Sequence, residues 1–372
     1  MQPVIDKSGT PLTEEGRRVM QICNACRYCE GFCAVFPSME KRFDFTSGDL
    51  KYLANLCHDC RECYYSCQYS PPHEFQLNVP KVFAGIRQQT YREYAWPGFM
   101  IRLFGDSTRA LFISAFIIPL LFVLGLLTLV GPEAGFTAYS DAEGSFYRLI
   151  SHSMMVWGFG IAFLFAIVAM VVGWLRFRAE ITTANERKLD WRTLGQAIHD
   201  AMKLRYLGGA EGDGCAYPDE RASNLRRRFH HLTFYGFLLC FAATSTATFY
   251  HYGLGLYAPY PFLSLPVMFG LVGGIMLLIG PVGLLWLKRI RDTEPDDPLQ
   301  TRMDISFLVL LFTTSLTGLL LLFLRETALM GIILVIHLGL VMGLFLTMPY
   351  GKFVHGIYRF GALVKYAKEE GV

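Results

Sequence analysis

The sequence predicts an all-α protein in two parts: a helical N-terminal domain (residues 1–109) and a transmembrane bundle of six helices (residues 110–372). Composition and its uneven distribution predict this division. Hydrophobic residues make up 53% of the 372 residues and charged residues 17%, and the mean hydropathy is +0.33. An ordinary soluble domain has a smaller fraction of hydrophobic residues and a larger fraction of charged residues. The apolar excess follows residue 109, whereas eight of the ten cysteines precede residue 68.

Six apolar runs are each long enough to cross a bilayer, which needs about 20 helical residues. They cover residues 111–130, 153–174, 232–250, 267–287, 305–324 and 329–348. One such run could be the buried helix of a soluble protein, but six in one chain predict membrane spans.

The loops between the runs predict an orientation. Residues 176–229 hold 11 Lys or Arg, whereas residues 251–266 hold none. Positive charge stays on the cytoplasmic side of a membrane, so both termini, the N-terminal domain and the loop 175–229 are expected in the cytoplasm of a bacterial-type inner membrane. The start of the chain lacks the apolar core of a signal peptide, which agrees with a cytoplasmic N-terminal domain. A net charge of +3 is too small to indicate nucleic-acid binding.

Two cysteine motifs of the same spacing lie in the N-terminal domain. Each reads C-x2-C-x2-C-x3-C, the first formed by Cys23, Cys26, Cys29 and Cys33, and the second by Cys57, Cys60, Cys63 and Cys67. Two copies of this spacing are typical of proteins that hold two [4Fe–4S] clusters, in which the fourth cysteine of each motif ligates the other cluster. Zinc sites also use C-x2-C pairs, but two matching runs of four fit iron–sulfur better.

The expected ligand sets are therefore mixed between the motifs. One cluster takes Cys23, Cys26, Cys29 and Cys67, and the other takes Cys57, Cys60, Cys63 and Cys33. The connecting segment 49–56 has helical spacing, with an N-cap expected at Ser47 or Asp49. This predicts an α-helical dicluster ferredoxin-like domain.

Histidines at membrane depth suggest functional sites. His337 and His355 are 18 residues apart, which places them on one face of a continuous helix, about 27 Å apart. His230 and His251 lie at opposite ends of the third run. The topology therefore pairs His230 with His355 at the inner side and His251 with His337 at the outer side, so the bundle is expected to hold one or two b-type haems. Such cofactors are built between facing helices of a bundle.

Two alternatives for the histidine ligands stay open. His231 competes with His230, although its side chain points away from the stripe of small residues that includes Gly236 and Thr244. His152, at the outer end of the second run, competes with His251.

Three stretches resemble a known family. They are ICNACRYCEGFC (residues 22–33), PHEFQ (72–76) and FHHLTFY (229–235), and they are similar to those of the tricarballylate/citrate utilization protein B family (TcuB, also called CitB). The resemblance implies an FAD-dependent tricarballylate dehydrogenase as partner and membrane quinone as electron acceptor. The membrane half also looks like the haem b subunits of nitrate reductase (gamma-like) and heterodisulfide reductase.

The sequence thus predicts a membrane electron-transfer protein with quinone reductase activity and no organic-acid chemistry of its own. It contains no Gly-rich dinucleotide motif and no P-loop, so no flavin or NAD site is expected. One alternative is a membrane subunit of another redox complex, such as a heterodisulfide-reductase-like one. Another is a redox sensor or transporter without haem, which the lack of carboxylates well inside the runs disfavours.

Overall fold

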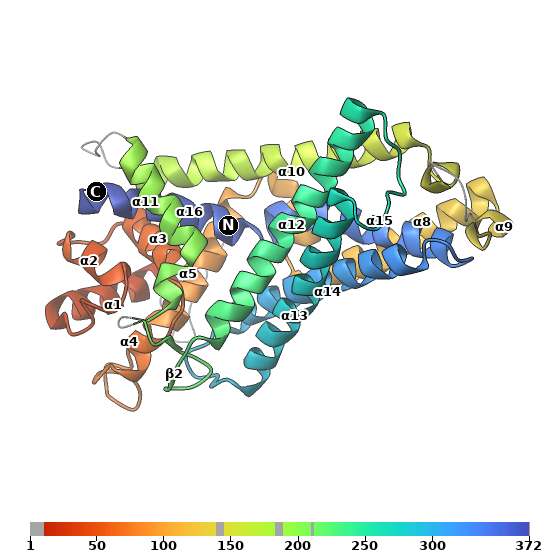
Figure 1. Cartoon of the computed structure of the whole chain (residues 1–372). Helices are drawn as coiled ribbons and strands as arrows, with labels where there is room; N and C mark the ends of the chain where they lie inside the picture. The colour runs from red at the N-terminus through yellow and green to blue at the C-terminus, as the bar shows by residue number, and fades with distance from the viewer. Residues whose placement is uncertain (1–10, 139–144, 183–188, 210–211, 372) are drawn as a thin grey trace.

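Figure 1 shows a computed structural model of the chain, which describes residues 11–138, 145–182, 189–209 and 212–371. The N-terminal helices gather at one end and the apolar helices extend from them to the other end (Figure 1). The all-α prediction is confirmed. The one sheet in the described residues is a two-stranded pairing of β1 (Cys215–Ala216) with β2 (Ala222–Ser223).

The N-terminal domain is built from five helices. They are α1 (Leu12–Cys26), α2 (Val35–Glu40), α3 (Ser47–Leu56), α4 (Glu62–Tyr65) and α5 (Val79–Tyr94). Helix α3 begins at a capping box, in which the Thr46 hydroxyl accepts from the Asp49 amide and the Asp49 carboxylate accepts from the Thr46 amide. The N-cap is therefore Thr46, not Ser47 or Asp49. The apolar face of α3, including Leu50 and Leu53, is fully buried.

Six spans in the described residues are long and apolar enough to cross a membrane, as predicted. The first, Ser107–Val130, is irregular, because π-helical turns (Ile113–Ile117 and Leu126–Val130) interrupt α7 (Ser107–Phe112) and α8 (Ile118–Gly125). The others are α10 (His152–Ile181), α12 (Leu225–Leu254), α13 (Leu265–Ile290), α14 (Pro298–Leu324) and a last span that joins α15 (Met330–Thr347) to α16 (Val354–Glu370). The shorter elements are η1 (Gly98–Met100), α6 (Ile101–Phe104), α9 (Pro132–Gly135), η4 (Ser145–Arg148), α11 (Trp191–Lys203), η5 (Arg205–Leu207) and η6 (Met348–Tyr350).

The continuous helix expected from His337 to His355 is not formed. Helix α15 ends at Thr347, and a 3₁₀ turn and Gly351, in an extended conformation, separate it from α16. Pro349 lies in this turn, and a proline ring cannot continue the hydrogen-bond ladder of a helix. His337 and His355 therefore lie on two helices, and their 18-residue spacing does not fix a shared face.

The N-terminal domain packs directly on the membrane helices. Buried residues of α16, among them Tyr358 and Leu363, belong to the same apolar core as Leu50 and Leu53 of α3. At the end of α10, Glu180 accepts hydrogen bonds from Lys51 at 2.8 and 3.1 Å and from the Tyr94 hydroxyl. Near the C-terminus, Glu369 pairs with Arg42 at 2.6 Å. Figure 1 shows α16 and the end of α10 lying beside α2 and α3.

The segment 175–229, expected as a charged loop, is partly structured. Helix α10 continues to Ile181, and α11 follows and packs on α16. The β1–β2 pair stands just before α12.

Candidate electron-transfer site

The first thiol set lies around one small pocket of the N-terminal domain. Helix α1 ends at Cys26 because Arg27 adopts a left-handed conformation (φ 56°), which turns the chain towards Cys29. Cys67 approaches from the second motif. The pocket is lined by Cys23, Cys26, Cys29 and Cys67, together with Cys63. The structure therefore brings together three cysteines of the first motif and the fourth of the second.

The second thiol set is more deeply buried. Cys57 and Cys60 are buried. Burial, and then repulsion from nearby thiols that include Cys33 and Cys57, raises the pKa of Cys60 and of Cys63. Left-handed turns at Asp59 (φ 58°) and Arg61 (φ 66°) fold the loop around these thiols. Cys33, from the first motif, therefore lies with the three leading cysteines of the second motif.

The environment of the thiols suits a bound cationic group. Burial, and then repulsion from neighbouring thiols, raises the pKa of Cys23, Cys29 and Cys33 to about 12. Coordination to metal deprotonates such thiols. Backbone amides already point at sulfur, because the Asp59 and Tyr69 amides donate to the Sγ atoms of Cys57 and Cys67 at 3.4 Å each. In the described ranges no three His, Cys, Asp or Glu side chains converge on a single metal ion.

His230 of α12 and His355 of α16 face each other. Their ring centroids are 6.2 Å apart and their planes are inclined by 72°. A metal bound between two imidazole rings, with metal–nitrogen bonds of about 2 Å each, would hold the ring centroids about 6 Å apart. The observed separation is close to this value. The Lys352 carbonyl accepts from His355 Nδ1 at 2.6 Å, which leaves Nε2 as the lone-pair nitrogen. His230 Nδ1 is buried with no hydrogen-bond partner among the described residues. The donor set fits a metal held between the two rings.

His231 lies elsewhere. Its ring packs on Tyr235, 5.7 Å between centroids, and the Tyr235 hydroxyl donates to the Met202 carbonyl of α11. Of the two adjacent histidines, His230 is therefore the one brought to His355.

The outer histidines are arranged differently from the expected pairing. His251, near the end of α12, stacks on His152 at the start of α10, with ring centroids 3.8 Å apart and planes inclined by 6°. Tyr147, Tyr252 and Tyr257 surround the two rings. His337 instead lies against α14, where its Nδ1 is 3.1 Å from the Thr317 hydroxyl. The described structure thus brings His251 to His152 and leaves His337 with other neighbours.

Three arginines, which the sequence analysis did not single out, bind the loop that carries Cys57. Arg359 of α16 donates to the Cys57 carbonyl at 2.8 Å, and Arg87 of α5 donates to the same oxygen at 3.3 Å. Arg226 of α12 donates to the Asp59 carbonyl and, at 3.4 Å, to the His58 carbonyl. Arg226 and Arg359 each lie four residues, about one helical turn, from His230 and His355 respectively.

A fourth arginine fixes the other side of this loop. Arg61 is almost fully buried and donates to the Asp292 carbonyl at 2.8 Å and to the Asp296 carboxylate. Asp292 and Asp296 lie between α13 and α14. The loop of the second thiol set is therefore attached to α12, to α16 and to the connection between α13 and α14. Only the run of three arginines at 226–228, one turn before His230, could have indicated this from the sequence.

Close helix packing sets the position of His230. Helices α12 and α13 approach so closely that a Cβ on Gly273 would lie 2.8 Å from the Gly236 carbonyl oxygen. A Cβ on Gly280 would lie 2.5 Å from the Thr233 hydroxyl. Glycines at this helix crossing keep α12, and with it His230, in place.

Comparison with known proteins gives matches over both parts of the chain. The family description "Citrate utilization protein B" matches residues 105–372, and "Citrate utilization protein B Fer4-like domain" matches residues 16–93. A relative from Escherichia coli, described as "Citrate utilization protein B", is 49% identical over 359 residues, which cover 96% of this chain and 92% of the relative. No solved structure matches the chain.

Proposed function

The chain belongs to the citrate utilization protein B family, and from this premise we propose that it carries electrons from a reduced flavoprotein to membrane quinone. Its Fer4-like N-terminal domain and its six candidate spans support iron–sulfur electron transfer in a multi-pass membrane protein. The carriers we propose are two [4Fe–4S] clusters and b-type haem, which accept and release single electrons when bound.

We assign the cluster ligands across the two motifs. Cys23, Cys26, Cys29 and Cys67 would hold one cluster, and Cys57, Cys60, Cys63 and Cys33 the other. The first set lines one pocket, and after burial the nearby thiols of Cys33 and Cys57 raise the pKa of Cys60 and Cys63, which supports the assignment. The amide donors to Cys57 and Cys67 would stabilise bound thiolates.

The burial of the two thiol sets suggests a direction of electron flow. Tyr28 lines the pocket of the first set and is 67% exposed, so a docked partner can approach that set. The second set is enclosed by α5, α12 and α16. We therefore place the entry of electrons at the first set and their exit at the second. The entering electrons would come from an FAD-dependent dehydrogenase, of the tricarballylate dehydrogenase type.

The exit would lead to haem held by His230 and His355. The observation that carries this proposal is the double role of α12 and α16. Each helix presents a histidine to the space between His230 and His355 and, one turn away, an arginine to the loop of Cys57. The same two helices thus fix the distance between the second thiol set and the histidine pair. His251 and His337 are the remaining candidate ligands for a second haem, with His152, which stacks on His251, as the alternative to His251.

Orientation is part of the proposal. We place the N-terminal domain and both termini in the cytoplasm, where a flavoprotein dehydrogenase can reach the first thiol set. The 11 Lys and Arg residues in the sequence of the stretch 176–229 support this orientation.

The test is an optical spectrum of the full-length protein, purified without oxygen and reduced with dithionite, with haem and iron measured per chain. The proposal predicts b-type α-bands and about eight non-haem irons, the content of two cubane clusters. Co-purification of a flavoprotein would separate a dehydrogenase partner from a heterodisulfide-reductase-like complex. Iron without haem would contradict the membrane half of the proposal and favour a redox sensor.

A further inference from the structure

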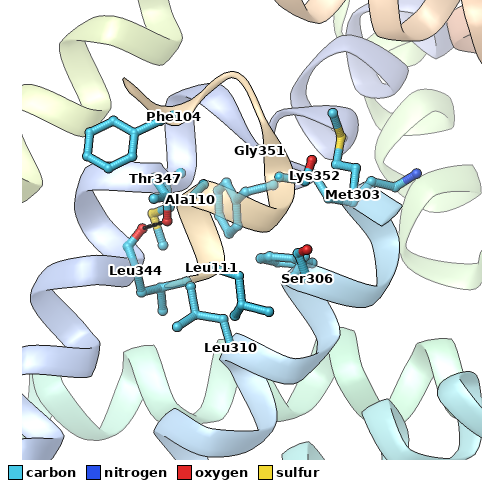
Figure 2. Close-up of a pocket in the computed structure, with 14 residues that line it drawn as sticks. Phe104, Ala110, Leu111, Met303, Ser306, Leu310, Leu344, Thr347, Gly351 and Lys352 are labelled. Atoms are coloured by element: carbon cyan, nitrogen blue, oxygen red, sulfur yellow. Dashed lines mark hydrogen bonds between the residues drawn. The ribbon is translucent and has the colours of Figure 1, made fainter. Parts of the chain in front are cut away.

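A cleft lies between the first span and the last two, next to the histidine pair. Figure 2 shows its walls, formed by α7, α14 and the turn between α15 and α16. Leu111, Leu310 and Leu344 make the wall apolar, and the Phe104 ring stands at one end. The cavity itself is small, about 40 Å³, and the cleft is partly open to its surroundings.

Two polar side chains line this apolar space. Ser306 of α14 and Lys352 of the α15–α16 turn lie on its walls (Figure 2). Lys352 Nζ is 2.7 Å from Asp304 Oδ1, and Lys288 Nζ is 2.7 Å from Asp304 Oδ2. The charge of Lys352 is therefore balanced by Asp304, while an ammonium group still has further donors to offer. The Thr347 hydroxyl, by contrast, donates to the Gly343 carbonyl of its own helix at 2.7 Å.

The turn that lines the cleft also contacts the histidine site. The Lys352 carbonyl accepts from His355 Nδ1, and Phe353, which lines the cleft, is the second residue before His355. The Phe353 ring packs on Phe237 of α12 and Phe307 of α14, with centroids 5.3 and 6.2 Å apart. One turn of chain therefore separates the wall of the cleft from a proposed haem ligand.

We propose that this cleft binds the head group of membrane quinone, with the Ser306 hydroxyl and the Lys352 ammonium as donors to a quinone carbonyl. This inference rests on the proposed function, which takes quinone as the electron acceptor. The location of the quinone site is the new part. The open side of an apolar cleft with polar side chains on its walls suits the edge of a flat ring that carries carbonyls. A charged lipid head group would have to compete with Asp304 for the same cations.

The reaction at this site balances as follows. The quinone would gain two electrons, supplied one at a time by the carrier that His230 and His355 would hold, and two protons from water. Its two carbonyls become hydroxyls, and the quinol leaves into the membrane. The electrons come from the upstream flavoprotein, which is oxidised by the same two electrons.

The outer cluster of His152, His251 and three tyrosines is the competing site. Its stacked rings and hydroxyl groups could also contact a quinone. It is placed at the opposite end of α12 from His230, however, and so lacks the direct connection to the second thiol set.

The first experiment is photoaffinity labelling of the intact wild-type protein in membranes with an azido-quinone, followed by peptide mapping. The proposal predicts labels within residues 104–111, 303–310 or 344–353, suppressed by excess decylubiquinone. Labels confined to residues 147–152 and 251–257 would overturn it in favour of the outer cluster.

The second experiment fills the cleft with Ala110→Trp and uses Leu120→Trp as the control, because Leu120 is 53% exposed on the same span and does not line the cleft. In cofactor-loaded protein, Ala110→Trp should slow oxidation by decylubiquinone at least tenfold and leave oxidation by ferricyanide unchanged. Equal quinone oxidation in both variants would overturn the site alone. Failure of the wild-type protein to be oxidised by quinone would overturn the proposed function as well.

Discussion

At the scale of single residues, the structure separates histidines that the sequence treats alike. His230 and His231 are neighbours in a run of polar residues, yet only His230 faces His355. The choice depends on the rotation of α12, which the glycine contacts with α13 determine. A helical wheel favours His230 from its small-residue stripe, but the partner on α16 follows only from the tertiary fold.

The histidine assignment predicts a selective loss of haem. His355→Ala and His230→Ala should each remove the haem held between these two residues and so lower the content by one haem per chain, since a haem iron depends on its axial ligands. His231→Ala is the matched control and should keep wild-type haem content. Haem content is measured by the pyridine haemochrome method on purified protein. Loss of haem in His231→Ala alone would contradict the assignment.

The thiol assignment predicts which cluster each fourth cysteine serves. Cys33→Ser should abolish the cluster of Cys57, Cys60 and Cys63 and remove about half of the non-haem iron. Low-temperature electron paramagnetic resonance of the reduced protein then shows one remaining cluster. Cys67→Ser should remove the other signal. If Cys33→Ser gave the signal expected of Cys67→Ser, each motif would hold its own cluster.

At the scale of elements, the loop of Cys57 depends on helices far away in the sequence. Arg359 and Arg226 hold its carbonyls from α16 and α12. No local pattern in the sequence could pair these arginines with backbone oxygens more than 160 residues away. Their contribution is to fix a distance rather than to bind a cofactor.

This positioning role predicts slower electron transfer without loss of cofactors. Arg359→Gln should slow the reduction of haem by the clusters by roughly tenfold, since a hydrogen bond from a charged donor is worth about 1.5–3 kcal/mol. Iron and haem contents should stay at wild-type values. The measurement is the rate of haem reduction after flash-driven reduction of the N-terminal domain.

The control for Arg359→Gln is Arg227→Gln. Arg227 donates to the Lys203 carbonyl at 2.9 Å, away from the cysteine loop, so its rate should be that of the wild type. Equal rates in both variants would show that the arginine contacts do not set the transfer distance.

The close crossing of α12 and α13 predicts that adding one methyl group to a glycine of α13 destabilises the fold at one position and not at another. Gly273→Ala should destabilise the fold by about 1–3 kcal/mol, because its Cβ would meet backbone atoms of α12 at 2.8–3.0 Å. Gly270→Ala, three residues earlier on α13, would meet only Ala243 at 3.7 Å and should be neutral. The two variants are compared by heating them in detergent and monitoring the release of haem. Equal stability of the two variants would contradict the close crossing.

The cap of α3 predicts a pH-dependent contribution to stability. Burial opposes ionisation of Asp49, but hydrogen bonds from Thr46 and Arg42 hold its pKa below the ordinary value. Because the pKa of Asp49 is lower in the folded than in the unfolded state, its ionisation stabilises the fold at pH values above the unfolded pKa of about 3.9. This stabilisation is lost as the pH falls through the folded pKa. Asp49→Asn should cost about 1 kcal/mol at neutral pH.

Urea denaturation of Asp49→Asn and wild type at several pH values checks this sign. The difference in unfolding free energy should be constant near neutrality and shrink below about pH 4. A difference that is the same at all pH values would mean that the charge of Asp49 plays no part.

At the scale of the whole molecule, the sequence predicted the architecture well and the connections poorly. Apolar length alone located all six spans, and the cysteine spacing located the Fer4-like domain. The break between α15 and α16 was missed, since a run of apolar residues continues up to the turn at Pro349. Asp304 was placed outside a span, whereas α14 starts at Pro298 and carries Asp304 inside, paired with two lysines.

The two halves of the molecule also form one packed structure. A boundary at residue 109 follows composition, but α16 and the end of α10 share the core of the N-terminal domain. This packing follows from long-range contacts that composition does not encode. It makes the membrane helices part of the support of both thiol sets, so the electron path we propose is held by one core.

The most direct test of the central claim is stopped-flow mixing of fully reduced, full-length protein with decylubiquinone, following haem and cluster absorbance in wild type and His355→Ala. The account predicts that quinone oxidises both haem and clusters in the wild type, and that the clusters of His355→Ala stay reduced. If the clusters of His355→Ala were oxidised by quinone as fast as those of the wild type, electrons would reach quinone without the histidine pair, and the proposed path would be wrong.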